Sequence, residues 1–235
     1  MTGQQAAGTS APALWFNPAG DGPGGRRTLT RERVVSEALA IIAEDGAQSL
    51  SMRGLAARLG VVPGALYRHV RGKEELYDLI LDAVLGEVDC QTDPAEPWPA
   101  RMAALAGRLR AVLESHPGIA VLMRTRDPLS PASLELAEAF LAPLAASGLP
   151  GRESGLAFRL IYDYAVGFAL ADPTSPAEQR LRDATTREQL HAFLRSLPAS
   201  RFPALTAHGA YAWDGDRDQR FTAGLEALLR GLAGN

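Results

Sequence analysis

The chain has 235 residues, 46% of them hydrophobic, and a formal net charge of −3, so it can hold one large or two modest domains with a well-buried core. Its single cysteine, Cys90, excludes an intrachain disulfide and a cysteine-based zinc site. Residues 1–25 contain no secretion signal and the longest apolar stretch, 156–171, is too short to cross a bilayer, so we expect a cytoplasmic protein.

The first 25 residues are rich in glycine, alanine and proline, which predicts a disordered tail. The first helix is expected to begin after Thr30, which is a good N-cap residue, and to end at Glu44-Asp45-Gly46. Its apolar residues recur at helical spacing and should form one buried stripe. These residues are Val34, Ala38, Ile41 and Ile42.

The stretch 51–73, SMRGLAARLGVVPGALYRHVRGK, predicts two short helices joined by a tight turn. Gly60 stands where a left-handed residue commonly ends a helix. Pro63 suits the first turn of the second helix, from which Leu66 and Val70 should face inward. This pattern is typical of a helix-turn-helix, whose second helix lies in the major groove of DNA.

The side chains on the outer face of this stretch are hydrogen-bond donors. Arginine can bind guanine with two hydrogen bonds, whereas lysine and tyrosine suit phosphate oxygens. Residues 26–73 carry nine basic against four acidic residues, so positive charge is concentrated here despite the net charge of the chain. The alternative is an ordinary helical hairpin with a solvated polar face. The donors are Arg53, Tyr67, Arg68, His69 and Lys73.

The segments LSMRGLAARLGV and LYRHVRGKEEL resemble the signature of TetR-type transcriptional regulators, and the resemblance covers residues 29–85. It implies an all-α protein with an N-terminal three-helix, helix-turn-helix DNA-binding domain, a connecting helix and a C-terminal helical domain for ligand binding and dimerisation. It also implies that Arg53 and the helix 63–69 approach base edges, with Tyr67, His69 and Lys73 mainly on the DNA backbone. The predicted DNA-binding set is Arg53, Pro63, Gly64, Ala65, Tyr67, Arg68, His69 and Lys73.

Asp93-Pro94-Ala95-Glu96-Pro97 breaks the pattern and marks the expected domain seam. We therefore divide the chain into a tail (1–25), a DNA-binding domain (26–72), a connecting helix (73–92) and a helical ligand-binding and dimerisation domain (93–235). No alternation of β-branched residues is present, so only helices are expected in the last part. They span residues 98–115, 117–124, 131–147, 151–171, 188–197 and 216–232, with a loop at 172–187.

Two of these helices are more apolar than one monomer core requires. The helix 151–171 is apolar on two faces, and the last helix carries a wide apolar stripe. We infer that one face covers an internal core or cavity and the other meets a second subunit in a four-helix bundle; the alternative is a single buried core helix. The resemblance, which extends to the tetracycline-repressor branch, implies the same interface. The predicted interface set is Leu156, Leu160, Tyr164, Gly167, Phe221, Leu225, Leu228, Leu229 and Leu232.

The resemblance further implies that a small molecule binds between helices of the second domain and changes the separation of the DNA-binding domains. His116 matches a histidine that contacts the drug in tetracycline repressors, and Asp163 replaces a magnesium-binding histidine, so we predict no metal site. The alternatives that involve no ligand are an ion pair of Arg159 with Asp163 and a solvent-facing His116 at a helix end. The predicted ligand contacts, which suggest a largely apolar effector, are Trp98, His116, Arg124, Phe158, Tyr162 and Asp163.

The function that fits best is a ligand-responsive, homodimeric regulator, most often a repressor, which binds a palindromic double-stranded DNA operator and is released by its effector. The alternative is a helical adaptor that binds protein through residues 51–73. The sequence excludes an enzyme, because it lacks the residues of a catalytic site. It has four histidines but neither a Cys/His cluster nor a glycine-rich phosphate loop. We expect no cofactor and no membrane partner.

Overall fold

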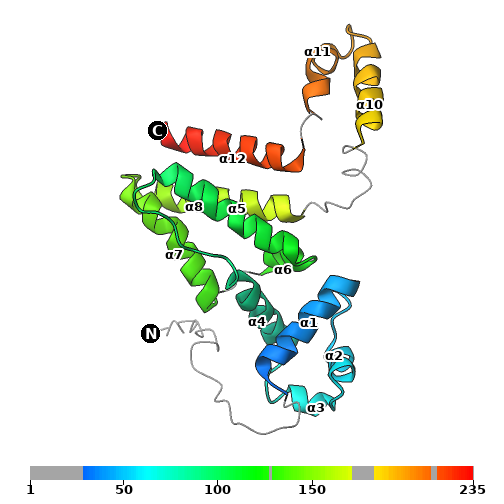
Figure 1. The fold of residues 1–235 in the computed structure, drawn as a ribbon, viewed down its shortest axis with the longest axis vertical. Coiled ribbons are helices and arrows are strands. Elements are labelled where there is room, and N and C mark those ends of the chain that lie inside the picture. Colours follow the sequence, from blue (N-terminus) through cyan, green and yellow to red (C-terminus); the bar gives the residue numbers. More distant parts are fainter. Residues whose placement is uncertain (1–28, 127–128, 171–182, 213–215, 235) are drawn as a thin grey trace, which may run out of the picture.

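The computed structural model describes residues 29–126, 129–170, 183–212 and 216–234, with the side chains of Arg124 and Ala212 excepted. Within these ranges every regular element is a helix, which confirms the predicted all-α class (Figure 1). None of the described helices has both the length and the apolar character that crossing a membrane requires. The predicted tail lies outside the described residues.

The N-terminal unit consists of α1 (Arg31–Asp45), α2 (Met52–Leu59) and α3 (Pro63–Leu66). Thr30 caps α1 as predicted, because its hydroxyl accepts from the Arg33 N–H at 3.3 Å. Ser51 caps α2 in the same way, accepting from the Gly54 N–H at 3.1 Å. Gly60 adopts the left-handed conformation, with φ of 69°, and its N–H bonds back to the end of α2. Local capping therefore sets the sharp corner between α2 and α3.

The helix α4 (Lys73–Leu85) joins this unit to the rest of the protein. It packs on α1 at one side and on α5, α6 and α7 at others. Leu76, Ile80, Leu81 and Val84 are fully buried, because a helix covered on several sides needs apolar residues around most of its circumference. The connecting helix therefore shares its core with both parts of the chain.

The C-terminal part contains α5 (Trp98–Ser115), α6 (Ile119–Thr125), α7 (Pro131–Ala146), α8 (Gly151–Leu170), α10 (Ala184–Ser196), α11 (Pro203–Ala212) and α12 (Arg217–Ala233). The helices α5, α7 and α8 pack together, and α12 lies across α5 and α8 (Figure 1). The helices α10 and α11 pack mainly against each other.

Two details of the C-terminal part differ from the sequence prediction. The helix α11 was not predicted; it begins at Pro203, and proline is well tolerated in the first turn of a helix. The helix α10 begins at Ala184 rather than at 188, since Asp183 caps it by accepting from the Thr186 N–H at 2.6 Å. Most of the predicted loop 172–187 lies outside the described residues.

The apolar stripe of α12 is also corrected by the structure. Phe221, Leu225 and Leu229 are buried inside their own chain, against α5 and α8, and are not available as an interface. Tyr164 of α8 belongs to the same internal contact: its ring stacks on Phe221 at 5.4 Å between centroids, and its hydroxyl donates to the Phe221 carbonyl at 3.0 Å. A wide apolar stripe fits core packing as well as it fits dimerisation, so periodicity could not separate the two.

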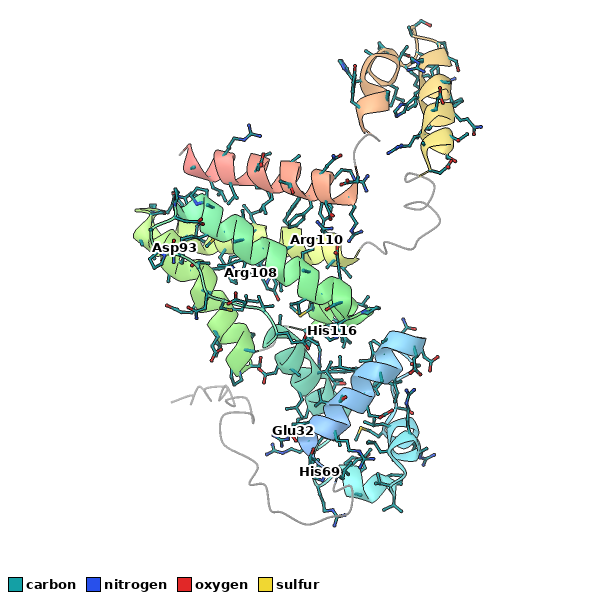
Figure 2. The ribbon with its side chains drawn as sticks, viewed as in Figure 1. Glu32, His69, Asp93, Arg108, Arg110 and His116 are labelled. Atoms are coloured by element: carbon teal, nitrogen blue, oxygen red, sulfur yellow. The ribbon has the colours of Figure 1, made fainter. Side chains whose placement is uncertain are left out.

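A buried group of charges joins α12 to α5. The Arg110 and Arg217 side chains are almost entirely buried, and both donate to the same Glu114 oxygen, Oε1, at 2.7 Å and 2.9 Å. Arg110 also lies over the Phe221 ring, with its Cζ 4.6 Å from the centroid, and Figure 2 shows Arg110 on the side of α5 that faces α12. Glu114 is therefore the shared counter-charge of two guanidinium groups.

The helices α8 and α12 approach each other closely at Gly224. A Cβ added there would lie 2.1 Å from the Tyr164 hydroxyl oxygen and 2.9 Å from Cζ, so the ring must move. We expect Gly224→Ala to lower the free energy of unfolding by about 1–3 kcal/mol, the usual cost of overpacking. Denaturant titration at a fixed protein concentration measures this change.

Gly107 on α5 supplies the control, because a Cβ there meets nothing within 4 Å. Gly107→Ala is expected to leave stability unchanged or to raise it by up to about 1 kcal/mol, through helix propensity alone. Equal effects of the two substitutions would contradict the close helix contact.

Candidate nucleic-acid interface and ligand pocket

The segment after the α2–α3 corner is shorter as a helix than predicted. The helix α3 ends at Leu66 rather than at 69, and Tyr67–His69 form a turn in which the His69 N–H bonds to the Leu66 carbonyl at 2.8 Å. Val62 provides no side-chain cap and Gly64 is a poor helix former, so little local energy supports a longer helix. The burial of Leu66 and Val70, as predicted, holds the segment in place.

The outer face of α2 and α3 presents several exposed side chains of the predicted set. Arg53, Pro63, Gly64, Tyr67 and Arg68 are all exposed. Among the described residues, no hydrogen bond or ion pair engages the side chains of the two arginines. Their full donor capacity is therefore available to a partner outside the chain.

The remaining members of the set are placed differently. Ala65 is buried, because it sits on the inward side of α3 next to Leu66, so its side chain is corrected from a surface to a core position. His69 and Lys73 are half-buried. The His69 carbonyl accepts from Arg31 Nε at 3.2 Å, which ties the turn to α1, and Lys73 Nζ lies 5.3 Å from the centroid of the Tyr77 ring.

Two residues outside the predicted set, Val62 and Arg58, also shape this surface. Val62 is 72% exposed and extends the outer face with an apolar side chain suited to thymine methyl groups. Arg58 is occupied instead by Glu37 and Glu44, each at 2.5 Å, and these hydrogen bonds raise the pKa of its guanidinium. Arg58 therefore braces α2 on α1 and adds little free positive charge.

A pocket of about 480 Å³ lies between the end of α6 and the C-terminal half of α8. Its walls combine apolar groups with two arginines, a carboxylate and a phenol. A smaller pocket of about 140 Å³ shares Tyr162 and Arg159 with it. The larger pocket is lined by Met123, Thr125, Arg126, Arg159, Tyr162, Asp163, Val166, Gly167 and Leu170.

Three of the six predicted ligand contacts line these pockets. Tyr162 lines both, Asp163 the larger and Phe158 the smaller. Asp163 pairs with Arg159 Nε at 2.9 Å, which is the ion pair that the sequence left open as an alternative. Within the described residues no cluster of histidine, cysteine and carboxylate side chains could hold a metal ion.

Two of the other predicted contacts, His116 and Trp98, do not line the pocket. His116 ends α5, and its Nε2 lies 2.9 Å from Glu87 Oε2 after the end of α4; Figure 2 shows it beside α1. Trp98 is the first residue of α5 and packs on the core. The side chain of Arg124 lies outside the described residues. His116 therefore contacts the end of the connecting segment instead of lining the cavity between α6 and α8.

Arg126 is a charged pocket residue that the sequence analysis did not predict. It follows the last residue of α6 and reaches α4, where Nη2 lies 2.5 Å from Glu74 Oε2. The available signal was weak, because an arginine just after a short helix is usually solvated.

The exposed side of α8 carries the part of the predicted interface that remains accessible. Leu156 and Leu160 are 49% and 48% exposed, and Gly167 lies exposed on the same helix. Leu228 and Leu232 of α12 are half-buried. Exposed leucines one turn apart on a helix are unfavourable in a monomer, so this surface suits contact with a second copy of the chain.

Comparison with known proteins identifies both parts of the chain. Residues 34–80 match the family described as "Bacterial regulatory proteins, tetR family", and residues 92–235 match "Tetracyclin repressor-like, C-terminal domain". An HTH-type transcriptional regulator of Saccharopolyspora erythraea is 35% identical, over 99% of this chain and 98% of that protein. The HTH-type transcriptional repressor DrrR1 of Streptomyces coeruleorubidus is 31% identical, over 93% of this chain and 83% of that protein.

Among solved structures, ActR of Streptomyces coelicolor superposes with a TM-score of 0.77 at 32% identity, covering 89% of this chain and 97% of ActR. ActR has also been solved in complex with actinorhodin, and that structure superposes with a TM-score of 0.76 over 88% of this chain and 100% of ActR.

Proposed function

The chain belongs to the TetR family of bacterial regulatory proteins, and on this premise we propose that it is a homodimeric repressor that binds a palindromic operator and leaves it when a small molecule fills the pocket between α6 and α8. Two features of one chain carry the proposal. Exposed arginines without hydrogen bonds to other described residues lie on the α2–α3 face, and a pocket adjoins the connecting helix.

The DNA-binding part of the proposal rests on the outer face of α2 and α3. Arg53 and Arg68 can make bidentate contacts to guanine, while Tyr67, His69 and Lys73 suit the phosphate backbone. Pro63 and Gly64 leave the start of α3 uncrowded, so its backbone can approach the groove closely. A dimer would place two such faces about one DNA turn apart, which is the reason for a palindromic operator.

The ligand part rests on the pocket and on the relatives. ActR, which shares this fold, binds actinorhodin, and DrrR1 is a repressor. Tyr162, Phe158, Asp163 and the two arginines are the proposed contacts here. Because charged groups line the pocket, we replace the sequence-based expectation of a largely apolar effector with that of a molecule carrying both apolar and polar groups.

Selection of bound fragments from genomic DNA tests the proposal directly. The expected result is enrichment of a palindromic sequence, bound with an affinity that falls steeply with salt, by roughly 0.9 log units per log unit of salt for each phosphate contacted. Binding without salt dependence, or enrichment of no sequence, would favour the helical adaptor instead.

Substitution of Arg68 is the sharpest test of the DNA-reading face. We expect Arg68→Ala to weaken operator binding by about 1–3 kcal/mol and to relax preference at one base pair in each half-site, because a bidentate contact would be lost. Operator variants titrated in parallel measure both effects. Arg195→Ala, at an exposed position on α10, is the matched control and should leave binding unchanged. Uniform weakening on all sequences would assign Arg68 to phosphate.

A further inference from the structure

One side chain, that of Arg126, belongs to the pocket and to the contact with the connecting helix at once. It lines the pocket beside Tyr162 and Asp163. On its other side, Nη1 and Nη2 lie 2.9 Å and 2.5 Å from Glu74 Oε2, and Nη2 also donates to the Glu74 carbonyl at 3.3 Å. The side chain is only 15% exposed, so its charge depends on protein or ligand partners more than on water.

The contact with α4 leaves Arg126 incompletely satisfied. Its Nε is buried without a hydrogen bond and lies 3.5 Å from Asp78 Oδ1. Burial raises the pKa of the Asp78 carboxyl; Arg126 opposes that rise, whereas Glu74 and Glu75 add to it. The first turns of α4 thus carry crowded negative charge, which Arg126 balances from the end of α6.

The same contact leads on to the DNA-binding unit. Arg126 Cζ lies 5.3 Å from the centroid of the Tyr77 ring. The Tyr77 hydroxyl donates to the Ala47 carbonyl at 2.9 Å, in the connection between α1 and α2. A change in the position of Arg126 therefore alters contacts of α4 that hold the DNA-binding unit.

The carboxylate that now holds Arg126 is easily replaced. Glu74 is 81% exposed, and water and salt weaken an ion pair with so exposed a group. An anion inside the pocket could accept two parallel hydrogen bonds from the guanidinium. Arg159 is less available for this role, since Asp163 of the same helix already pairs with it.

We propose that the effector is an aromatic anion, with a carboxylate or phenolate, and that this group draws Arg126 away from Glu74 and Asp78 and so releases α4. The inference rests on the proposed function and specifies the effector class and the residue that senses it. The aromatic part of the effector lies against Tyr162, and Phe158 extends that apolar wall. The anion binds the released state more tightly than the operator-bound state, and this difference is the coupling between the two sites.

Paired probes that differ only in charge test the effector class. Calorimetric titration of the full-length protein without DNA compares 2-naphthoate and anthracene-2-carboxylate with their neutral carboxamides. An acid should bind about tenfold more tightly than its amide, the usual gain from a charge-assisted pair. Arg126→Gln should abolish this preference, and Arg152→Gln should keep it. Equal binding of every acid and amide, or a preference retained in Arg126→Gln, overturns the proposal.

A second variant tests the release of α4. Glu74 and Asp78 are largely and partly exposed, and in the double variant Glu74→Gln/Asp78→Asn, Arg126 loses both of its ion-pair partners on α4. The acid should bind this variant at least as tightly as the wild type but should lower operator affinity less. If the acid lowered operator affinity in this variant as much as in the wild type, the proposed release of α4 through Arg126 would be overturned. Failure of the unmodified protein to bind any operator would refute the proposed function and leave the acid–amide comparison standing.

Discussion

Glu114→Gln is expected to lower the free energy of unfolding by about 3 kcal/mol, although it changes neither the length nor the shape of the side chain. The substitution removes the one negative charge that both Arg110 and Arg217 contact, at 2.7 Å and 2.9 Å. Both guanidinium groups are almost entirely buried, so replacing their shared carboxylate by a neutral amide removes part of their charge compensation, which costs more than the loss of an exposed ion pair. Denaturant titration followed by circular dichroism measures the change at a fixed protein concentration.

The neighbouring acid provides a matched control for this prediction. Asp218 also contacts Arg110, with an oxygen 2.5 Å from Nη2, but its side chain is 83% exposed. Asp218→Asn should therefore cost less than about 1 kcal/mol, as exposed ion pairs do. If the two isosteric substitutions had equal effects, burial of the two arginines would not be the source of the stability.

Leu156→Glu combined with Leu160→Glu is expected to dissociate the dimer and to weaken operator binding by at least about a hundredfold. Both leucines are exposed on α8 in the isolated chain, so the fold of the monomer should survive. Paired glutamates from two subunits would repel one another and would have to lose their hydration in the interface. Without the dimer, each DNA-binding unit would bind its half-site alone and the gain from bivalent binding would be lost.

Light scattering after size exclusion and titration of the operator measure the two consequences together. Val121→Glu, at an exposed apolar position on α6, controls for the introduction of negative charge. It should leave both the mass in solution and the affinity for the operator unchanged. A glutamate double variant that remains a dimer would place the interface elsewhere on the molecule.

Local signals in the sequence were sufficient for the start of the first two helices and for the corner of the N-terminal unit. Thr30 and Ser51 cap their helices, and Gly60 adopts the left-handed conformation at the corner that leads to α3. Such features act through hydrogen bonds and backbone angles within a few residues, so they can be identified without knowledge of the tertiary structure. The same locality explains why the limits of α5 were predicted correctly.

The candidate sites were predictable only where exposure follows directly from the pattern. The outward position of Arg53, Tyr67 and Arg68 followed from the buried stripe opposite to them. The burial of Ala65 did not, because a short helix offers too few turns to define its inner face.

What the sequence by itself determined is the all-α class, the helix-turn-helix corner and the family, because these depend on periodicity, capping residues and a local signature. Only the tertiary structure decided which apolar and charged residues face each other. It placed Phe221 and Leu229 inside the chain, assigned Glu114 to two arginines, and brought Arg126 to the pocket and to α4 at once. The physical reason is that these contacts join residues distant in the sequence, and the periodicity of one helix cannot specify which neighbour will cover a given face.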